Sequence, residues 1–496
     1  MSGTPAAIKV RSLAWVRERV AYSAETVCEL FGVPFSEKTT LIADLLNKRI
    51  IGRRGVEDTA VGEEAEPLEG YIIGADYYFC FVGIYCREQY MVCILPKYAN
   101  AESFRIPEQG DFNRPWPASR RALFSRVLKA IQRYKHSQHR ELPEWQQEAA
   151  DSNQLSLMVT LLCDYVENGV YRDVRKVDAL NERGRVLWHA SIHKTSAVLQ
   201  QGTPVYPDVV TRRTKFEHQH PITLLHKRVV ASCFRCLHDL GVIDLFGLPE
   251  LDGEESVFAY QTDDLAYMLY LVESELNVQF DSRRRYILML LREYLLKQSA
   301  ANADACTEYA FGCSSFNLLW EDACRCVFGY DYSRLWAIRP PEWKFTNRIA
   351  SAGKSLEPDV IIRDESATYV LDAKYYLPID SGSGMPTGLP GIASVTKQFL
   401  YQKALLNPKA VEIKKGHISP PIYNAFVMPL AQCSEPGGKC VAYYATVTMP
   451  LFDELKIIVL CVSPDRLFSC YTEYSDTQYL RDAVLTCIRG QSEASV

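Results

Sequence analysis

The chain has 496 residues, of which 48% are hydrophobic and 23% are charged, the composition of a folded globular protein. The net charge of −5 excludes a basic surface spread over the whole chain, so any nucleic-acid surface has to be local. No apolar run reaches the roughly 18–20 residues of a membrane span and the N-terminus is too charged for a signal peptide, which predicts a cytoplasmic protein with no membrane partner.

Residues 1–118 are predicted to form an N-terminal region with a small helical element and a β-meander. The helical element covers residues 24–54 and fits a winged or helix-turn-helix element, or else a helical hairpin within a larger domain. Residues 71–98 are dense in aromatic and β-branched side chains, which favour strands, and predict about three strands. Residues 103–119 are interrupted by prolines and indicate a linker.

Residues 119–300 are predicted to form a mainly helical middle domain. A helix at 120–140 has an apolar stripe, and the rest of its surface carries Arg and Lys side chains that suit solvent, phosphates or an acidic partner. More basic residues lie between 212 and 228, a second candidate surface for a nucleic acid or a partner.

Cysteine and histidine are common enough to raise the question of a metal site. Most of the 16 cysteines stand inside apolar runs, where free thiols behave as small hydrophobic groups. Cys233 and Cys236 form a CxxC pair, but no second ligand pair with zinc-site spacing follows. The histidines between 189 and 226 fit no recognised metal motif. We therefore interpret the cysteines as structural thiols.

The final segment, residues 301–496, carries the candidate site. In FNLLWEDACRCVFG, residues 316–329, the apolar residues have helical spacing and Glu321 stands beside their stripe. The stretch EPDVIIRDESATYVLDAKYY, residues 357–376, predicts two strands joined by a polar turn. Because side chains alternate along a strand, Asp372 and Lys374 should share one face. Asp359 begins the partner strand and is expected across from Asp372.

These residue types together indicate metal-assisted hydrolysis of a phosphodiester. Clustered carboxylates repel one another unless a cation joins them, and all-oxygen ligands favour Mg²⁺ or Mn²⁺. The metal would activate a water, and the lysine would orient or deprotonate that water and offset the developing charge. The alternative interpretation of Asp372 and Lys374 is an exposed ion pair, which would contribute little energy.

The four residues resemble the PD-(D/E)xK nuclease signature, with Glu321 on a helix, Asp359 after a proline, and Asp372 and Lys374 as the DxK pair. The resemblance implies a multidomain α/β (α+β) protein whose C-terminal core is a mixed sheet flanked by helices. It also implies that Asp359 and Asp372 are metal ligands. Glu321 would be a ligand or a supporting acid, and Lys374 would position the water.

The nuclease family often carries Gln and Tyr on a helix after this core. Here SVTKQFLYQKALL, residues 394–406, offers Gln398, which the resemblance assigns to the active site or to the DNA. The family's spacing from Gln to Tyr is not quite met, so Gln398 is a stronger candidate than Tyr401.

A narrower resemblance, to the LlaJI family of restriction endonucleases, depends on the order of sequence blocks over roughly residues 70–450. The blocks are DYYFCFVGIY with VCILPKY, RVLWHASIHKTSAVLQQGTPVYPDVVTRRT with ITLLHKRVV, and LLWEDACRCVFG with the PD and DAKYY stretches. LlaJI enzymes are similar to McrC, the nuclease subunit of McrBC-type systems. The resemblance implies cleavage of double-stranded DNA in phage defence, a separate McrB-like AAA+ GTPase and a cognate methyltransferase. The sequence has no GxxxxGKS/T phosphate loop, in keeping with a motor on another polypeptide.

Other functions stay open at this point. A stand-alone repair or recombination nuclease of the same fold would cut without a GTPase. A non-catalytic assembly factor would stimulate a motor and hydrolyse nothing, although the presence of all four charged site residues argues against such decay. A further hypothesis is that residues 1–300 recognise the DNA sequence by themselves.

Overall fold

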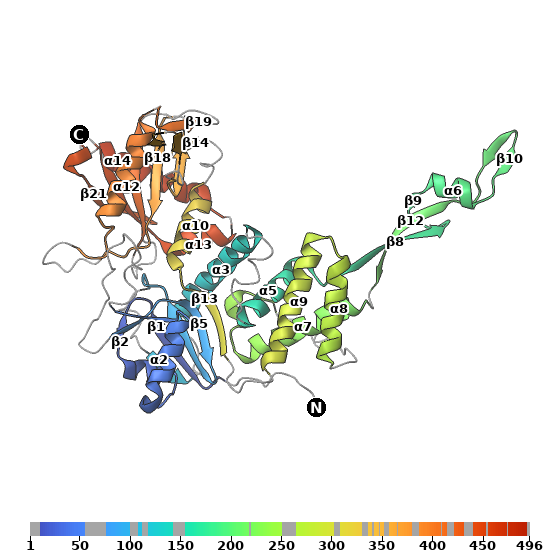
Figure 1. Cartoon of the computed structure of the whole chain (residues 1–496), viewed down its shortest axis with the longest axis horizontal. Coiled ribbons are helices and arrows are strands. Elements are labelled where there is room, and N and C mark those ends of the chain that lie inside the picture. The colour runs from blue at the N-terminus through green and yellow to red at the C-terminus, as the bar shows by residue number, and fades with distance from the viewer. Residues whose placement is uncertain are drawn as a thin grey trace. The chain divides into compact units, whose positions relative to one another are not determined.

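The computed structural model describes residues 10–54, 76–99, 108–111, 118–141, 154–217, 220–249, 264–301, 308–329, 336–339, 342–346, 348–351, 357–364, 366–378, 386–407, 409–413, 421–430, 440–452, 455–473 and 475–493. These residues form two compact units, one within 152–307 and the other within 10–151 and 308–496 (Figure 1). The first and last parts of the sequence therefore fold together. The helix at 118–141 groups with them, whereas the sequence grouped it with the middle segment.

A five-stranded sheet at the N-terminus opens the larger unit. β1 pairs in parallel with β6 and antiparallel with β7, while β5 pairs antiparallel with both β6 and β13. Because β13 follows the middle segment in sequence, this sheet joins the two outer parts of the chain. The strands across the sheet are β13 (Glu308–Cys313), β5 (Val82–Arg87), β6 (Tyr90–Leu95), β1 (Ser12–Arg17) and β7 (Glu108–Asp111).

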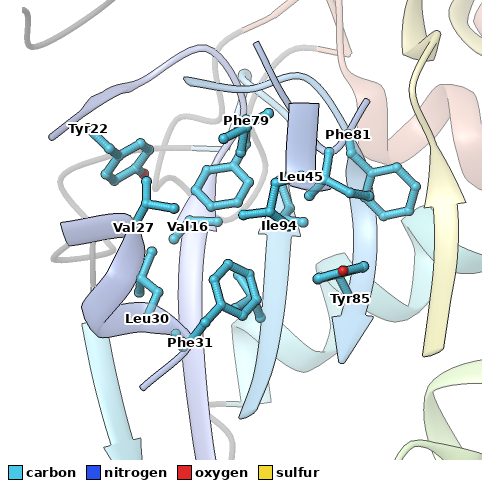
Figure 2. Packing of buried hydrophobic residues seen from close by; sticks show 14 of the residues in the cluster. Val16, Tyr22, Val27, Leu30, Phe31, Leu45, Phe79, Phe81, Tyr85 and Ile94 are labelled. Carbon is cyan, nitrogen blue, oxygen red and sulfur yellow. The ribbon is translucent and has the colours of Figure 1, made fainter. Parts of the chain in front are cut away.

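Two helices and a second small sheet build the core of this region. α1 (Ala24–Leu30) begins after Ser23, whose hydroxyl accepts a hydrogen bond from the Thr26 N–H and so caps the helix. Side chains of α1 and α2 pack against Val16 and Ile94 of the sheet (Figure 2). The 24–54 region is therefore a helical pair inside a larger domain. Its other elements are β2 (Ala21–Tyr22), η1 (Phe35–Glu37), α2 (Lys38–Asn47), β3 (Ile51–Arg53) and β4 (Tyr77–Phe79).

Two predictions for this region need correction. The expected three strands are present as β4, β5 and β6, but they are not one meander, because β4 pairs with β2 and β3 in the second sheet. Part of the expected linker at 103–119 is the strand β7, which pairs with β1. The pattern of residues within one short segment does not show which distant strand that segment will pair with.

The basic helix α3 (Ala118–Glu141) packs within the larger unit. The guanidinium of Arg126 lies 2.7 Å from the Asp465 carboxylate. Arg133 lies 4.2 Å above the ring of Tyr471, and Lys135 lies 5.2 Å above that of Phe311. These cations therefore hold α3 against its neighbours in the same chain.

The C-terminal part forms the expected mixed sheet flanked by helices. β18 is antiparallel to β17 and parallel to β20, and β22 is parallel to β20 and antiparallel to β21. Val370 of β18 packs with Tyr401 of α12, whereas the adjacent Tyr369 accepts a hydrogen bond from Arg489 of α14. Helices therefore cover both faces. The elements are α10 (Phe316–Phe328), β17 (Val360–Arg363), β18 (Thr368–Ala373), α12 (Ile392–Leu405), β20 (Ile422–Pro429), β21 (Val441–Val447), β22 (Ile457–Val462), α13 (Pro464–Glu473) and α14 (Thr477–Glu493).

Short elements complete this part of the chain. β14 (Trp336–Ile338) pairs with β19 (Val411–Ile413), and β15 (Glu342–Phe345) pairs with β16 (Arg348–Ser351). η3 (Pro450–Phe452) precedes β22.

The middle unit contains strands as well as helices, and the sequence did not predict those strands. Within residues 173–217, β8 and β12 pair antiparallel over eight residues, and an ion pair of Arg212 with Asp178 joins them. Figure 1 shows these two strands extending away from the helices, with β10 at their far end. The elements are α5 (Gln154–Asn168), β8 (Asp173–Leu180), β9 (Arg185–Val186), α6 (Trp188–Lys194), β10 (Val198–Gln200), β11 (Thr203–Val205), β12 (Val210–Glu217), α7 (Pro221–Asp239), η2 (Ile243–Phe246), α8 (Leu265–Val278) and α9 (Ser282–Ala301). Of the helices that the structure describes, none is long and apolar enough to cross a membrane.

Candidate active site

The predicted hairpin is present, and its register brings two acids together. In the pairing of β17 with β18, Val360 lies opposite Leu371 and Ile361 lies opposite Val370. The same register places Asp359 opposite Asp372. The Asp359 Oδ2 atom accepts a hydrogen bond of 2.8 Å from the backbone N–H of Ala373. The carboxylate of Asp359 is therefore fixed beside the strand that carries the other two residues of the motif.

Asp372 and Lys374 lie on the same side of the strand, as alternation predicts. The Lys374 Nζ atom lies 3.0 Å from the Asp372 Oδ2 atom, and the two side chains are only 12% and 3% exposed. The N–H of Lys374 donates to the carbonyl of Val427 at 2.9 Å, which extends the pairing with β20 by one residue. The exposed ion pair that was the alternative interpretation does not fit this burial.

Glu321 reaches the same place from helix α10. The apolar stripe of this helix is buried as expected, and the indole N–H of Trp320 donates to the carbonyl of Val427 at 3.2 Å. This bond holds the helix on the sheet next to the point where Lys374 is also held. Burial raises the pKa of Glu321, with Asp372 adding to the rise and Lys374 opposing it.

The electrostatics of Asp359 show how closely the charges gather. Burial and, after it, the neighbouring carboxylates of Asp372 and Glu321 raise its pKa to about 7, against the opposing effects of the Ala373 N–H and the Lys374 ammonium. Near neutral pH the protein alone therefore does not hold all three acids fully ionised. A bound cation would remove this repulsion and favour the charged carboxylates.

The donor set fits a hard divalent cation. In the described part of the chain, no three His, Cys, Asp or Glu side chains converge into a ready-made metal cage. Mg²⁺ does not need one, because it usually keeps several waters and takes one or two protein carboxylates together with substrate phosphates. Asp359 and Asp372 can supply those two carboxylates. Glu321 lies close enough for its negative charge to act on Asp359. The cysteines that the structure describes form no disulfide.

Gln398 lies inside the protein rather than among the four charged residues. Its side chain is 0% exposed, and its amide nitrogen donates to Asn424 Oδ1 at 2.6 Å and to the carbonyls of Val370 and Ala425 at 3.3 Å. A side chain buried to this extent has no exposed surface with which to contact DNA. Gln398 instead fastens α12 to the strand two residues before Asp372.

Two other residues on α12 stand closer to the site than the sequence suggested. The Tyr401 hydroxyl donates to the carbonyl of Glu357 at 2.8 Å, two residues before Asp359. Lys397 is exposed, and its charge lowers the pKa of Glu321, which places its ammonium within electrostatic reach of the site. The sequence contained a signal for both, because they flank Gln398 on the helix that was singled out.

Asn424 is a supporting residue that the sequence analysis missed. It is buried on β20, and its amide nitrogen donates to the carbonyl of Gln398 at 3.0 Å and to Gln402 Oε1 at 3.1 Å. The available signal was a single amide in the apolar strand IYNAFVMP. Buried polar groups need partners, and this one pairs with two glutamines of α12.

Comparison with known proteins places the chain in a family. The family model of the LlaJI restriction endonuclease matches residues 81–461, so the chain belongs to the LlaJI restriction endonuclease family. It is 25% identical over 408 residues to the type II restriction enzyme BsuMI component YdjA of Bacillus subtilis strain 168, covering 80% of this chain and 81% of that protein.

A solved structure is also similar in part. It is the refined half-complex from a tetradecameric assembly of Thermococcus gammatolerans McrB AAA+ hexamers with bound McrC. The alignment covers 96% of this chain and all of that chain, with 14% identity and a TM-score of 0.36. A score this low does not establish a shared fold.

Proposed function

We propose that this chain is a Mg²⁺-dependent DNA endonuclease, the cleaving subunit of a restriction system. The observation that carries the proposal is that Asp359, Asp372 and Lys374 lie together at the open end of one hairpin, with Glu321 of α10 within electrostatic reach. Family membership supports the reaction class, and the residue types support phosphodiester hydrolysis.

In this proposal each residue has its own task. Asp359 and Asp372 hold Mg²⁺, or Mn²⁺ in its place, and Glu321 is a third ligand or a supporting acid. When bound, the ion lowers the pKa of a water and stabilises charge on a phosphate oxygen. Lys374, held by Asp372, orients the attacking water and offsets the negative charge that develops on the phosphate.

The α12 helix supports this chemistry in two ways. Gln398 and Tyr401 keep the two strands of the hairpin in place from the protein side. The exposed ammonium of Lys397 is suited to a DNA phosphate next to the scissile one, because a cation there contributes sequence-independent affinity.

We also propose that cleavage depends on a separate AAA+ GTPase similar to McrB, with a cognate methyltransferase protecting host DNA. The sequence has no GxxxxGKS/T phosphate loop, and the relative YdjA is named as a component of the restriction enzyme BsuMI. The alternatives are a stand-alone repair or recombination nuclease and a non-catalytic factor that stimulates a motor. The proposed place of action is the cytoplasm, where phage DNA arrives.

One cleavage assay separates these functions. The purified chain is incubated with plasmid DNA and either Mg²⁺, Mn²⁺ or a chelator, with and without a candidate McrB-like GTPase and GTP. We expect cutting only when a divalent ion, the GTPase and GTP are all present. Cutting without the GTPase would favour the stand-alone nuclease. GTP hydrolysis stimulated by the chain with no DNA cut under any condition would favour the non-catalytic factor.

A further inference from the structure

The residue after Lys374 connects the site to the N-terminal sheet. The Tyr375 hydroxyl donates to Glu18 Oε2 at 2.8 Å, although 357 positions separate the two residues in sequence. The backbone N–H of Lys97 approaches both acceptors at 3.3 Å, the Glu18 Oε2 atom and the Tyr375 hydroxyl. The Lys97 ammonium lies 4.2 Å from the centre of the Tyr375 ring. Glu18 and Lys97 are both buried, with 7% and 6% of their surface exposed.

The topology of the N-terminal sheet explains why these two residues meet. β1 and β6 are parallel neighbours, and Arg17 at the end of β1 is in register with Leu95 at the end of β6. Glu18 is the first residue after β1 and Lys97 the second after β6, so both emerge at the same edge of the sheet. The carboxylate of Glu18 is buried there, and such a group is stable only when donors satisfy it.

The ring of Tyr375 contacts the second segment of the candidate site as well. Its centre lies 5.1 Å from that of Phe316 and 6.3 Å from that of Trp320, both on α10. Trp320 is the residue before Glu321. One buried tyrosine therefore lies against the helix that carries Glu321 and directly follows Lys374.

Lys374 needs such an anchor because regular pairing ends beside it. β18 ends at Ala373, and residues 374–378 have no regular secondary structure. The last ladder-like hydrogen bond is that of the Lys374 N–H with Val427. The path of the chain beyond this bond, and with it the direction of the Lys374 side chain, depends on where Tyr375 is held.

We propose that Glu18 and Lys97 are positioning residues for Lys374, and that they act through Tyr375. The N-terminal sheet is then part of the catalytic apparatus and not only a separate domain. The inference rests on the proposed function, since it assigns Lys374 a task in hydrolysis. A displaced Lys374 would leave the DNA bound but the water poorly oriented.

The first test is the variant Tyr375→Phe, which removes the hydroxyl and keeps the ring. We expect kcat for DNA cleavage to fall about 10- to 100-fold, the loss typical of a small misplacement, with KM for DNA unchanged. Tyr171→Phe is the matched control, because the Tyr171 hydroxyl also donates to a glutamate, Glu275, at 2.8 Å, in the other unit. The control should cleave at the wild-type rate.

A double-mutant cycle tests whether Glu18 acts through the same bond. Glu18→Ala should lose as much activity as Tyr375→Phe, and the double variant should lose no more than either. Glu18→Gln keeps an oxygen acceptor and should retain most of the activity. Additive losses, or a kcat for Tyr375→Phe equal to the wild-type value, would overturn the proposal.

A structural readout keeps this inference separate from the proposed function. In crystal structures we expect the Lys374–Asp372 contact to be present in the wild type and Tyr171→Phe, and lost in Tyr375→Phe. If Tyr375→Phe does not fold, Glu18→Ala takes its place. If the wild type cuts no DNA, the proposed function fails, and the position of Lys374 in these structures still decides the inference. A Lys374 that stays on Asp372 in the variant would overturn it.

Discussion

The carboxylate of Asp359 accepts a hydrogen bond of 2.8 Å from the backbone N–H of Ala373 across the β17–β18 hairpin. Ala373 stands between Asp372 and Lys374, so this one bond fixes the first acid against the middle of the DxK motif. The geometry of the site therefore comes mainly from the register of a single hairpin. The helix α10 adds Glu321 from outside that hairpin.

Removing the lysine should affect both activity and stability. Lys374→Met deletes the group that orients water, and we expect cleavage to fall about 100- to 10,000-fold. The same change leaves the buried Asp372 carboxylate without its ion-pair partner, at a cost of roughly 3 kcal/mol in the free energy of unfolding. Single-turnover cleavage and urea denaturation measure the two effects.

The double variant Lys374→Met/Asp372→Asn is the control for that experiment. Without the buried charge it should recover most of the lost stability, while cleavage stays at least as low as in Lys374→Met. Equal stability of the single and double variants would show that the Asp372–Lys374 pair is not a desolvated ion pair.

Gln398 should matter for folding more than for contact with DNA. Gln398→Leu removes a donor from Asn424 Oδ1 and from two backbone carbonyls, which should cost about 1–3 kcal/mol in the free energy of unfolding. DNA affinity, measured by fluorescence anisotropy with Ca²⁺ in place of Mg²⁺, should stay at the wild-type value. Lys397→Met is the comparison, since it should weaken DNA binding without loss of stability. Weaker DNA binding by Gln398→Leu, with the free energy of unfolding unchanged, would mean that Gln398 reaches the DNA.

The middle unit should lose stability in acid because of His226. This side chain is buried, and its Nδ1 atom accepts a hydrogen bond of 2.9 Å from the Tyr171 N–H, so the neutral ring is required there. Burial lowers its pKa to about 4, with Arg283 lowering it and Asp164 opposing. Because the unfolded state takes up the proton first, stability is complete above the unfolded pKa and decreases as the pH falls from about 6.5 towards 4.

Hydrogen exchange in the full chain measures this effect. Between pH 7 and pH 5 the opening free energy of α7 should fall by about 2 kcal/mol, after correction for the intrinsic exchange rates. In His226→Asn the amide oxygen can replace Nδ1 as the acceptor, and the pH dependence should largely disappear. A variant that remains as acid-sensitive as the wild type would assign the effect to other groups.

The sequence predicted the candidate site better than it predicted the rest of the fold. Alternation along 368–374 and the polar turn determined the hairpin, and the apolar stripe determined α10, because both patterns are local. The role of Gln398 depends on its burial, which only long-range packing decides. Glu18 and Tyr375 lie too far apart in sequence for any periodic pattern to pair them. The strands within 173–217 were missed because many charged residues interrupt their apolar pattern.

Cleavage by Asp372→Asn tests the central claim most directly. Asp364→Asn is the matched control, because Asp364 stands in the turn of the same hairpin and binds Ser366 and Arg489 instead of the candidate site. With plasmid DNA, Mg²⁺, the GTPase and GTP, we predict wild-type cutting by Asp364→Asn and a loss of at least about 100-fold for Asp372→Asn, with folding and DNA binding intact. Cutting by Asp372→Asn at the wild-type rate would contradict the assignment of this site.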